Sequence, residues 1–106
     1  MVLVLARMSV WNFKKGKREE AFAELDRILN SNTRNTSGFR GYISLLSYDN
    51  ANSATILTLW KDKESLEASE KGVFAVAINR IRDSIEGDPV LLNYRVFSTE
   101  LFNRKE

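Results

Sequence analysis

The sequence contains neither cysteine nor histidine, and each absence removes whole classes of chemistry. Without cysteine the chain has no disulfide framework, no thiolate nucleophile and no thiolate metal site. Without histidine it lacks the side chain that most often transfers protons near neutral pH and most often binds metals. A zinc enzyme, a serine triad and a haem protein with an axial histidine are therefore disfavoured, and we expect no metal site.

The chain also lacks the marks of a nucleic-acid or membrane protein. Its 106 residues carry a formal net charge of +2 and a sequence pI of about 9.0, without the dense basic stripe of a dedicated nucleic-acid binder. The apolar N-terminal stretch has neither a basic n-region nor a small-residue cleavage site, and Arg7 interrupts it before it could span a membrane. We therefore expect the protein in the cytoplasm. Its 28% charged and 43% hydrophobic residues are typical of a globular protein, and we expect one domain over residues 1–106.

The first third of the chain changes from strand periodicity to helix periodicity. Residues 2–13 alternate as a strand with two mostly apolar faces, and Arg7, Ser9 and Trp11 share one of them. A basic turn over residues 14–18 then leads into residues 18–32, whose apolar positions recur at helical spacing. We expect this helix to cover one face of a sheet, and a polar loop over residues 30–38 to follow it.

A hairpin and a short helix form the centre of the chain. Residues 39–48 and 54–60 read as antiparallel strands joined by turn chemistry at residues 49–53. The second of these strands ends at a tryptophan, and Asp62 is placed to cap the helix that follows. We expect Gly72 to end that helix in the left-handed conformation, and we expect any functional site at this strand–helix junction.

The remainder completes a recognisable order of elements. Residues 73–86 carry a helical apolar stripe, a Gly-Asp-Pro stop follows, and residues 90–101 read as a last strand. The order βαββαβ predicts an α+β, ferredoxin-like fold, in which an antiparallel four-stranded sheet carries its helices on one face. The apolar second face of the first strand and of the hairpin predicts a homodimer through the sheet face.

Three segments resemble the antibiotic biosynthesis monooxygenase (ABM) family of dimeric α/β barrels. They are GFRGYISLLSYDN from Gly38, TLWKDKESLEAS from Thr58, and the Val73-Phe74 pair. The resemblance implies a homodimer of two sheets packed face to face, with a pocket between the other face of each sheet and its helices. The family includes cofactor-free oxygenases of electron-rich aromatic polyketides or quinols, and haem-degrading enzymes.

The chain departs from two patterns of the family. Many members carry a histidine in the helix after the tryptophan, where this chain has Ser69. The haem-degrading branch uses an asparagine, a tryptophan and a histidine, and the nearest residues here are Ser9, Ala68 or Ser69, and Ile78. Haem cleavage is therefore disfavoured. The resemblance implies a monooxygenase of a small aromatic, phenolic or quinol substrate that uses no cofactor.

Trp60 is the residue predicted to be catalytic, because its indole could stack on an aromatic substrate and donate one hydrogen bond. Arg7, beside Ser9 and Trp11, could hold a substrate phenolate or carboxylate; the alternative is a salt bridge to a helix carboxylate such as Glu24 or Glu70. Trp60 could equally be a large core residue.

Further substrate-binding candidates lie on other elements. The phenol of Tyr42, like that of Tyr94, could position a substrate oxygen or could sit in water at a sheet rim. Asn79 and Arg80 could line the pocket or face solvent, and we expect solvent for Arg80. Ser69 and Phe74 join the candidate set through the resemblance. The predicted set that binds substrate is Arg7, Ser9, Trp11, Tyr42, Ser69, Phe74 and Asn79.

Two alternatives to an enzyme stay open. Without histidine, the base that deprotonates a substrate would have to be a carboxylate, a tyrosine or the medium, so a non-catalytic dimeric barrel that binds a small hydrophobic ligand is the second hypothesis. RNA binding is the third, because Arg40-Gly41-Tyr42 begins like the aromatic signature of an RNA-recognition motif. That match breaks at Ile43 and Ser44 and lies on the wrong strand, so we expect no nucleic-acid partner.

Overall fold

The computed structural model describes residues 5–32 and 36–100, and their elements follow the predicted order. The strands and helices are β1 (Leu5–Asn12), α1 (Arg18–Asn32), β2 (Phe39–Leu46), β3 (Ser53–Trp60), α2 (Lys63–Lys71), α3 (Val73–Ile81), the 3₁₀ turn η2 (Arg82–Ser84) and β4 (Val90–Arg95). The ferredoxin-like α+β prediction is therefore confirmed.

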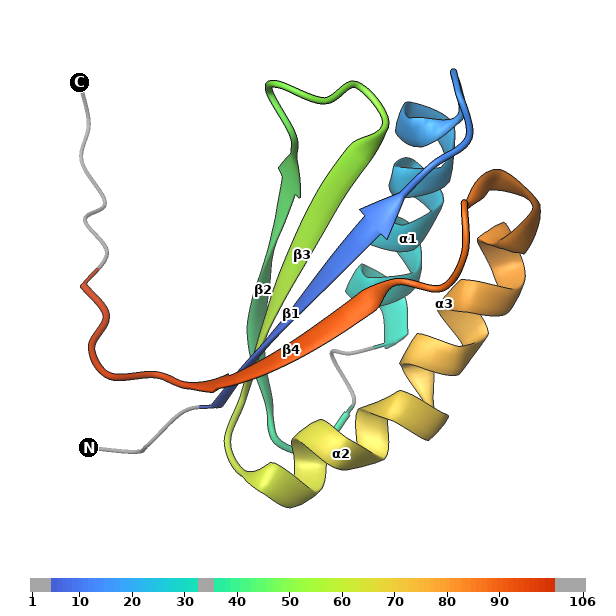
Figure 1. Cartoon of the computed structure of the whole chain (residues 1–106). Coiled ribbons are helices and arrows are strands. Elements are labelled where there is room, and N and C mark those ends of the chain that lie inside the picture. Colours follow the sequence, from blue (N-terminus) through green and yellow to red (C-terminus); the bar gives the residue numbers. More distant parts are fainter. Residues whose placement is uncertain (1–4, 33–35, 101–106) are drawn as a thin grey trace.

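The sheet is fully antiparallel, and its four strands lie in the order β2-β3-β1-β4. Figure 1 shows α1, α2 and α3 together on one side of the sheet, as predicted, with no described element over the other side. The two central strands, β1 and β3, are therefore covered by helices on one face only.

The strand register assigns each side chain to one of two faces. Arg7 lies opposite Thr58 on β3 and opposite Asn93 on β4, so these three share the face beneath the helices. We call this the covered face; it includes Leu5, Arg7, Ser9, Trp11, Ala54, Ile56, Thr58, Trp60 and Tyr42. The other, the open face, includes Ala6, Met8, Val10, Ile43, Leu45, Leu57, Leu59, Val90, Leu92 and Tyr94.

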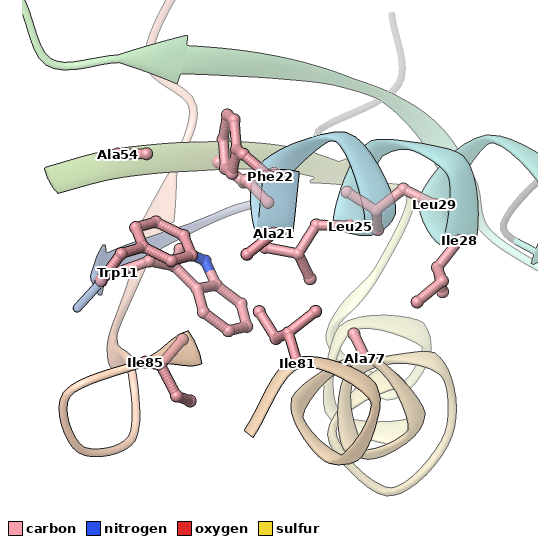
Figure 2. Packing of buried hydrophobic residues seen from close by; sticks show 12 residues of the cluster. Trp11, Ala21, Phe22, Leu25, Ile28, Leu29, Ala54, Ala77, Ile81 and Ile85 are labelled. Atoms are coloured by element: carbon pink, nitrogen blue, oxygen red, sulfur yellow. The ribbon is translucent and has the colours of Figure 1, made fainter. Parts of the chain in front are cut away.

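The core fills the space between the covered face and the helices. Figure 2 shows Trp11 of β1 reaching between Leu25 of α1 and Ile81 of α3. Trp11 and Leu25 are each 1% exposed, and the other buried members of this cluster are Phe13, Ala21, Phe22, Ile28, Leu29, Ala54, Ile56, Ala77, Ile81 and Ile85. The helical stripes predicted at residues 18–32 and 73–86 therefore pack on the same strands.

The start of α2 is capped as the sequence predicts. The Asp62 carboxylate accepts a hydrogen bond from the Ser65 backbone N–H at 2.8 Å. The end differs from the prediction, because Gly72 has φ −99° and is not left-handed. Gly72 is both the C-cap of α2 and the N-cap of α3. The chain therefore enters a second helix at Gly72 and does not reverse in a left-handed conformation.

Several predicted helices and strands are longer than the observed ones. The predicted helix over 73–86 ends as α-helix at Ile81, and Ile85 instead forms an isolated bridge with Phe13. The predicted strand 90–101 ends at Arg95, which lies opposite Leu5, the first described residue of β1. Residues 2–4 and 101 of the predicted strands lie outside the described residues.

Candidate functional site

Arg7 is a charged side chain in the middle of the covered face, and it is only 2% exposed. Its Nε donates a hydrogen bond to Asn93 Oδ1 at 2.9 Å, Nη1 donates to Ser69 Oγ at 3.3 Å, and Nη2 donates to Glu70 Oε1 at 2.8 Å. Strand β4 and helix α2 thus supply the partners that a buried guanidinium requires. Of the two helix carboxylates that the sequence offered as partners, the structure has Glu70.

A small enclosed cavity lies beside Arg7, between the covered face and helices α1 and α3. Its volume is about 20 Å³, enough for a single water molecule. Its lining is Arg7, Ser9, Trp11, Leu25, Leu29, Ile56, Thr58, Phe74 and Ala77. The structure therefore brings together four of the predicted site residues: Arg7, Ser9, Trp11 and Phe74.

The polar groups of the cavity wall hold one another in place. The Trp11 indole N–H donates to Ser9 Oγ at 2.9 Å, and Ser9 Oγ lies 3.4 Å from the Ile56 carbonyl oxygen, to which it donates. The Trp11 ring also meets the Phe74 ring at 5.4 Å between centroids, inclined by 57°. Tilted ring pairs at this separation are favoured among aromatic side chains, and these two rings form the aromatic part of the cavity wall.

Trp60 occupies the opposite end of the same face. It is 1% exposed, its indole N–H donates to Thr58 Oγ1 at 2.9 Å, and its ring meets Phe39 edge-on at 5.2 Å. Phe39 in turn lies 6.2 Å from Tyr42, between ring centroids. Trp60 and Tyr42 are outside the cavity lining, and Trp60 reaches it only through Thr58. The catalytic role of Trp60 stays a prediction.

A wider and more open cleft lies between α2 and the segment that precedes β2. Its volume is about 380 Å³, and it is lined by Thr36, Ser37, Glu64, Ser65, Ala68, Ser69, Gly72 and Val73. Ser69 is 6% exposed, and its hydroxyl donates to the Leu66 carbonyl at 2.6 Å while it accepts from Arg7. Ser69 of the cleft wall and Arg7 of the cavity wall are thus joined by a hydrogen bond.

The remaining predicted residues lie away from both spaces. Asn79 is exposed on α3, and its Oδ1 accepts a hydrogen bond from Arg82 at 3.3 Å. Arg80 is exposed as predicted and pairs with Glu24 at 3.2 Å. Tyr94 projects from the open face with 49% of its surface exposed.

Two carboxylates at the surface, Glu24 and Glu19, have pKa values below their ordinary range. The hydrogen bond from Arg27 and then its charge lower the pKa of Glu24 despite some desolvation, and Arg80 adds to this. The hydrogen bond from Arg18 lowers the pKa of Glu19 in the same way. Neither carboxylate lines the cavity or the cleft.

Among the described residues there is no group of three or more metal-binding side chains. None of the described helices has the length and hydrophobicity of a membrane span.

Sequence reasoning missed the contribution of other elements to the site. Leu25 and Leu29 of α1, Ala77 of α3 and Asn93 of β4 contact the cavity or Arg7. Thr58 is the exception that alternation could have found, since it shares a face with Ile56 and Trp60. Which helix residues complete the wall depends on how the helices pack, and alternation along a strand does not give this.

Comparison with known proteins agrees with this architecture. The sequence model of the family described as Antibiotic biosynthesis monooxygenase matches residues 1–73. No curated protein matches the sequence. A conserved protein from Methanosarcina mazei Go1 has a similar structure, with 21% identity, TM-score 0.75, and coverage of 89% of this chain and 93% of that one.

Two further structures have the same fold at lower identity. SnoaB, a cofactor-independent oxygenase from Streptomyces nogalater, is 14% identical with TM-score 0.69, and the match covers 91% of this chain and 95% of SnoaB. A protein of unknown function from Nitrosomonas europaea is 15% identical with TM-score 0.79, and the match covers 97% of this chain and 98% of that one. At these identities the likeness shows the fold alone.

Proposed function

Because this chain belongs to the antibiotic biosynthesis monooxygenase family, we propose that it is a cofactor-independent monooxygenase of a small phenolic or quinol substrate. The observation that carries the proposal is the cavity beneath the helices, where a buried guanidinium lies beside an aromatic wall. SnoaB, which shares the fold, is itself described as a cofactor-independent oxygenase. The substrate in such a reaction supplies the electrons.

The reaction asks little of the protein beyond binding and exclusion of water. For an anthrone-type substrate, a ring CH₂ and O₂ give a ring carbonyl and water, so no external reductant is required. The protein must favour the ionised substrate, hold its oxygen beside a positive charge and keep bulk water out. Arg7 supplies the charge, and Trp11 and Phe74 supply the aromatic part of the cavity wall.

The substrate site comprises the cavity and the adjoining cleft together. The cavity alone holds one water, whereas a cleft of about 380 Å³ is of the size that binds small molecules. An aromatic ring in the cleft, beside Val73, lies one side chain away from Arg7. In this proposal Trp60 does not contact the substrate. It acts through its hydrogen bond to Thr58, which holds the Thr58 hydroxyl at the cavity wall.

The assembly is a homodimer through the open face. Five apolar or aromatic side chains of that face are 41–54% exposed, namely Ile43, Leu45, Val90, Leu92 and Tyr94. An exposed apolar surface of this breadth on a small protein marks an interaction site, and no side chain assigned above to the open face is charged. Light scattering at micromolar concentration should give the mass of two chains. A mass of one chain would contradict the dimer.

Oxygen consumption tests the activity. We expect the purified protein to consume oxygen with hydroquinones or anthrone-type phenols without added cofactor, faster than their autoxidation. Trp11→Phe and Trp60→Phe should each lower the rate, Trp11→Phe by at least about tenfold because loss of its indole N–H and of ring volume rearranges the cavity wall beside Arg7. Tyr48→Phe, at a fully exposed ring, is the control that should leave the rate unchanged.

The variants also separate the two hypotheses. Uptake no faster than autoxidation for the whole panel would contradict the oxygenase and favour the barrel that only binds a hydrophobic ligand. Uptake that survives Trp60→Phe but not Trp11→Phe would assign Trp60 to the core alone. Circular dichroism of each variant checks that the fold is retained.

A further inference from the structure

The proposed reaction needs a group that removes a proton from the substrate, and few side chains around the cavity and the cleft can do so. Of the described residues that line the cavity, Arg7 alone is ionisable, and a guanidinium keeps its proton in proteins. Of those that line the cleft, Glu64 alone is ionisable, and none of the chain's tyrosines lines either space. Glu64 is therefore the carboxylate that the walls of the two spaces offer as a base.

The Glu64 carboxylate is not engaged by another side chain. Neither a hydrogen bond nor an ion pair joins it to any residue that the structure describes. The other two glutamates of α2 differ, since Glu67 pairs with Lys63 at 3.9 Å and Glu70 pairs with Arg7 at 2.8 Å. Glu64 thus keeps its oxygens for a ligand in the cleft.

Helix periodicity turns Glu64 and Glu67 toward different surfaces. Glu64 and Ala68 are four residues apart, so they lie one turn from each other on the same face of α2, and both line the cleft. Because Ala68 has no side chain beyond its Cβ, the space next to Glu64 stays open to a ligand. Glu67 lines a separate groove between α2 and the strands β1 and β4, whose other lining residues are Leu5, Lys63, Leu66, Asn93 and Tyr94.

We propose that Glu64 is the catalytic base that ionises the substrate in the cleft. With an anthrone-type substrate, a Glu64 carboxylate oxygen takes a proton from the ring CH₂. The electron pair of the broken C–H bond stays on the substrate as its enolate, and the neutral Glu64 acid then releases the proton to water. This inference rests on the proposed function for the class of substrate, and it goes beyond that proposal by assigning the proton transfer to a residue.

Hydrogen exchange at the substrate carbon tests this step in the absence of oxygen. In anaerobic D₂O the CH₂ signal of anthrone in the proton NMR spectrum is lost as deuterium replaces hydrogen, and we expect the wild type to accelerate this loss above its rate in buffer. Glu64→Gln should lower the accelerated rate by about ten- to a hundredfold, the lower end of what a general base contributes, because Glu64 is exposed and water replaces it in part. The half-saturating anthrone concentration should stay the same, since glutamine keeps the shape of the side chain.

Three further variants separate the base from the shape of the cleft. Glu67→Gln is the matched control on the same helix and should leave the exchange rate unchanged. Glu64→Asp retains a carboxylate and should keep more of the acceleration than Glu64→Gln does. Ala68→Leu fills the space next to Glu64 at an exposed helix position, so it should raise the half-saturating anthrone concentration. Circular dichroism checks that each variant is folded.

Three outcomes would overturn the proposal. They are wild-type exchange no faster than in buffer, equal exchange in Glu64→Gln and the wild type, and equal losses in Glu64→Gln and Glu67→Gln. A protein whose exchange depends on Glu64 but that consumes no oxygen would retain the base and lose the proposed monooxygenase activity. Oxygen consumption that is equal in the wild type and Glu64→Gln would retain the activity and lose the base.

Discussion

The two faces of the sheet distribute polarity in opposite ways. The covered face buries Arg7 and the Ser9 hydroxyl, and half-buries Thr58, beside two tryptophans that are each 1% exposed. The open face is apolar, yet Leu92 is 41% exposed and Leu45 is 48% exposed. The same four strands thus hide a charge on one side and leave leucines in water on the other.

This contrast separates binding of a ligand from assembly. A buried charge costs free energy, and hydrogen bonds from Arg7 to α2 and β4 offset that cost. An apolar face exposed to water also costs free energy, and a second apolar face would remove that cost. We therefore expect a ligand to bind at the covered face and another copy of the chain to bind at the open face.

The largest expected effect comes from truncating the core beneath the helices. Trp11→Ala should lower the free energy of unfolding by about 3–5 kcal/mol, because a fully buried ring is removed from a packed cluster. Leu92→Ala on the open face should cost the isolated subunit less than about 1 kcal/mol. Urea denaturation at a protein concentration low enough for the wild type and both variants to be monomeric measures both losses. Equal losses would mean that the two faces are packed alike.

A charge on the open face should act on assembly instead of on the fold. Leu92→Lys places two ammonium groups in the proposed interface and should weaken dimerisation by about a hundredfold, which corresponds to about 3 kcal/mol. Analytical ultracentrifugation should then find monomers at concentrations where the wild type is dimeric, with the far-UV spectrum unchanged. A Leu92→Lys protein that remains as dimeric as the wild type would exclude the open face as the interface.

The smallest effect should come from the cap of α2, which covers Arg7 without touching the open face. The Ser65 backbone N–H lowers the pKa of Asp62 below its usual 3.8. A carboxyl with a lowered folded pKa stabilises the fold above that usual value, and the contribution is lost as pH falls through the lower folded pKa. The Tm advantage of wild type over Asp62→Ala should be constant from about pH 7 to 5 and shrink below about pH 4.

Asp62→Asn is the matched control for that titration. The amide oxygen can still accept the Ser65 N–H, but the side chain does not ionise. Its Tm advantage over Asp62→Ala should therefore not change with pH through this range. The same shrinkage in Asp62→Asn would assign the pH dependence to other carboxyls.

The sequence was sufficient for the order of elements and for local features. Alternation and helical spacing gave all four strands and the covering helices, and Asp62 was identified as a cap because a capping bond needs only neighbours in the chain. The conformation of Gly72 was wrong, since helix ends are usually followed by a reversal and here a second helix begins at once.

The position of the candidate site could be located only in the three-dimensional structure. Trp11 and Trp60 look equivalent in sequence, because each follows a hydroxyl residue by two positions. In the structure each indole also donates a hydrogen bond to that hydroxyl. The register separates them, since Trp11 lies opposite Ala54 and Trp60 lies opposite Leu5, at the other end of the strand pair. Only the packing of α1 and α3 decides which end encloses a cavity.

Methyl NMR during titration with 2-naphthoate tests the central claim, that ligands bind between the covered face and its helices. Ile56 and Val73 report on the cavity and the cleft, and Ile43 and Leu57 report on the open face of the neighbouring strands. We predict that the Ile56 and Val73 methyl signals move with ligand concentration, while those of Ile43 and Leu57 stay in place. Movement of the Ile43 and Leu57 signals with Ile56 and Val73 unchanged would contradict the account.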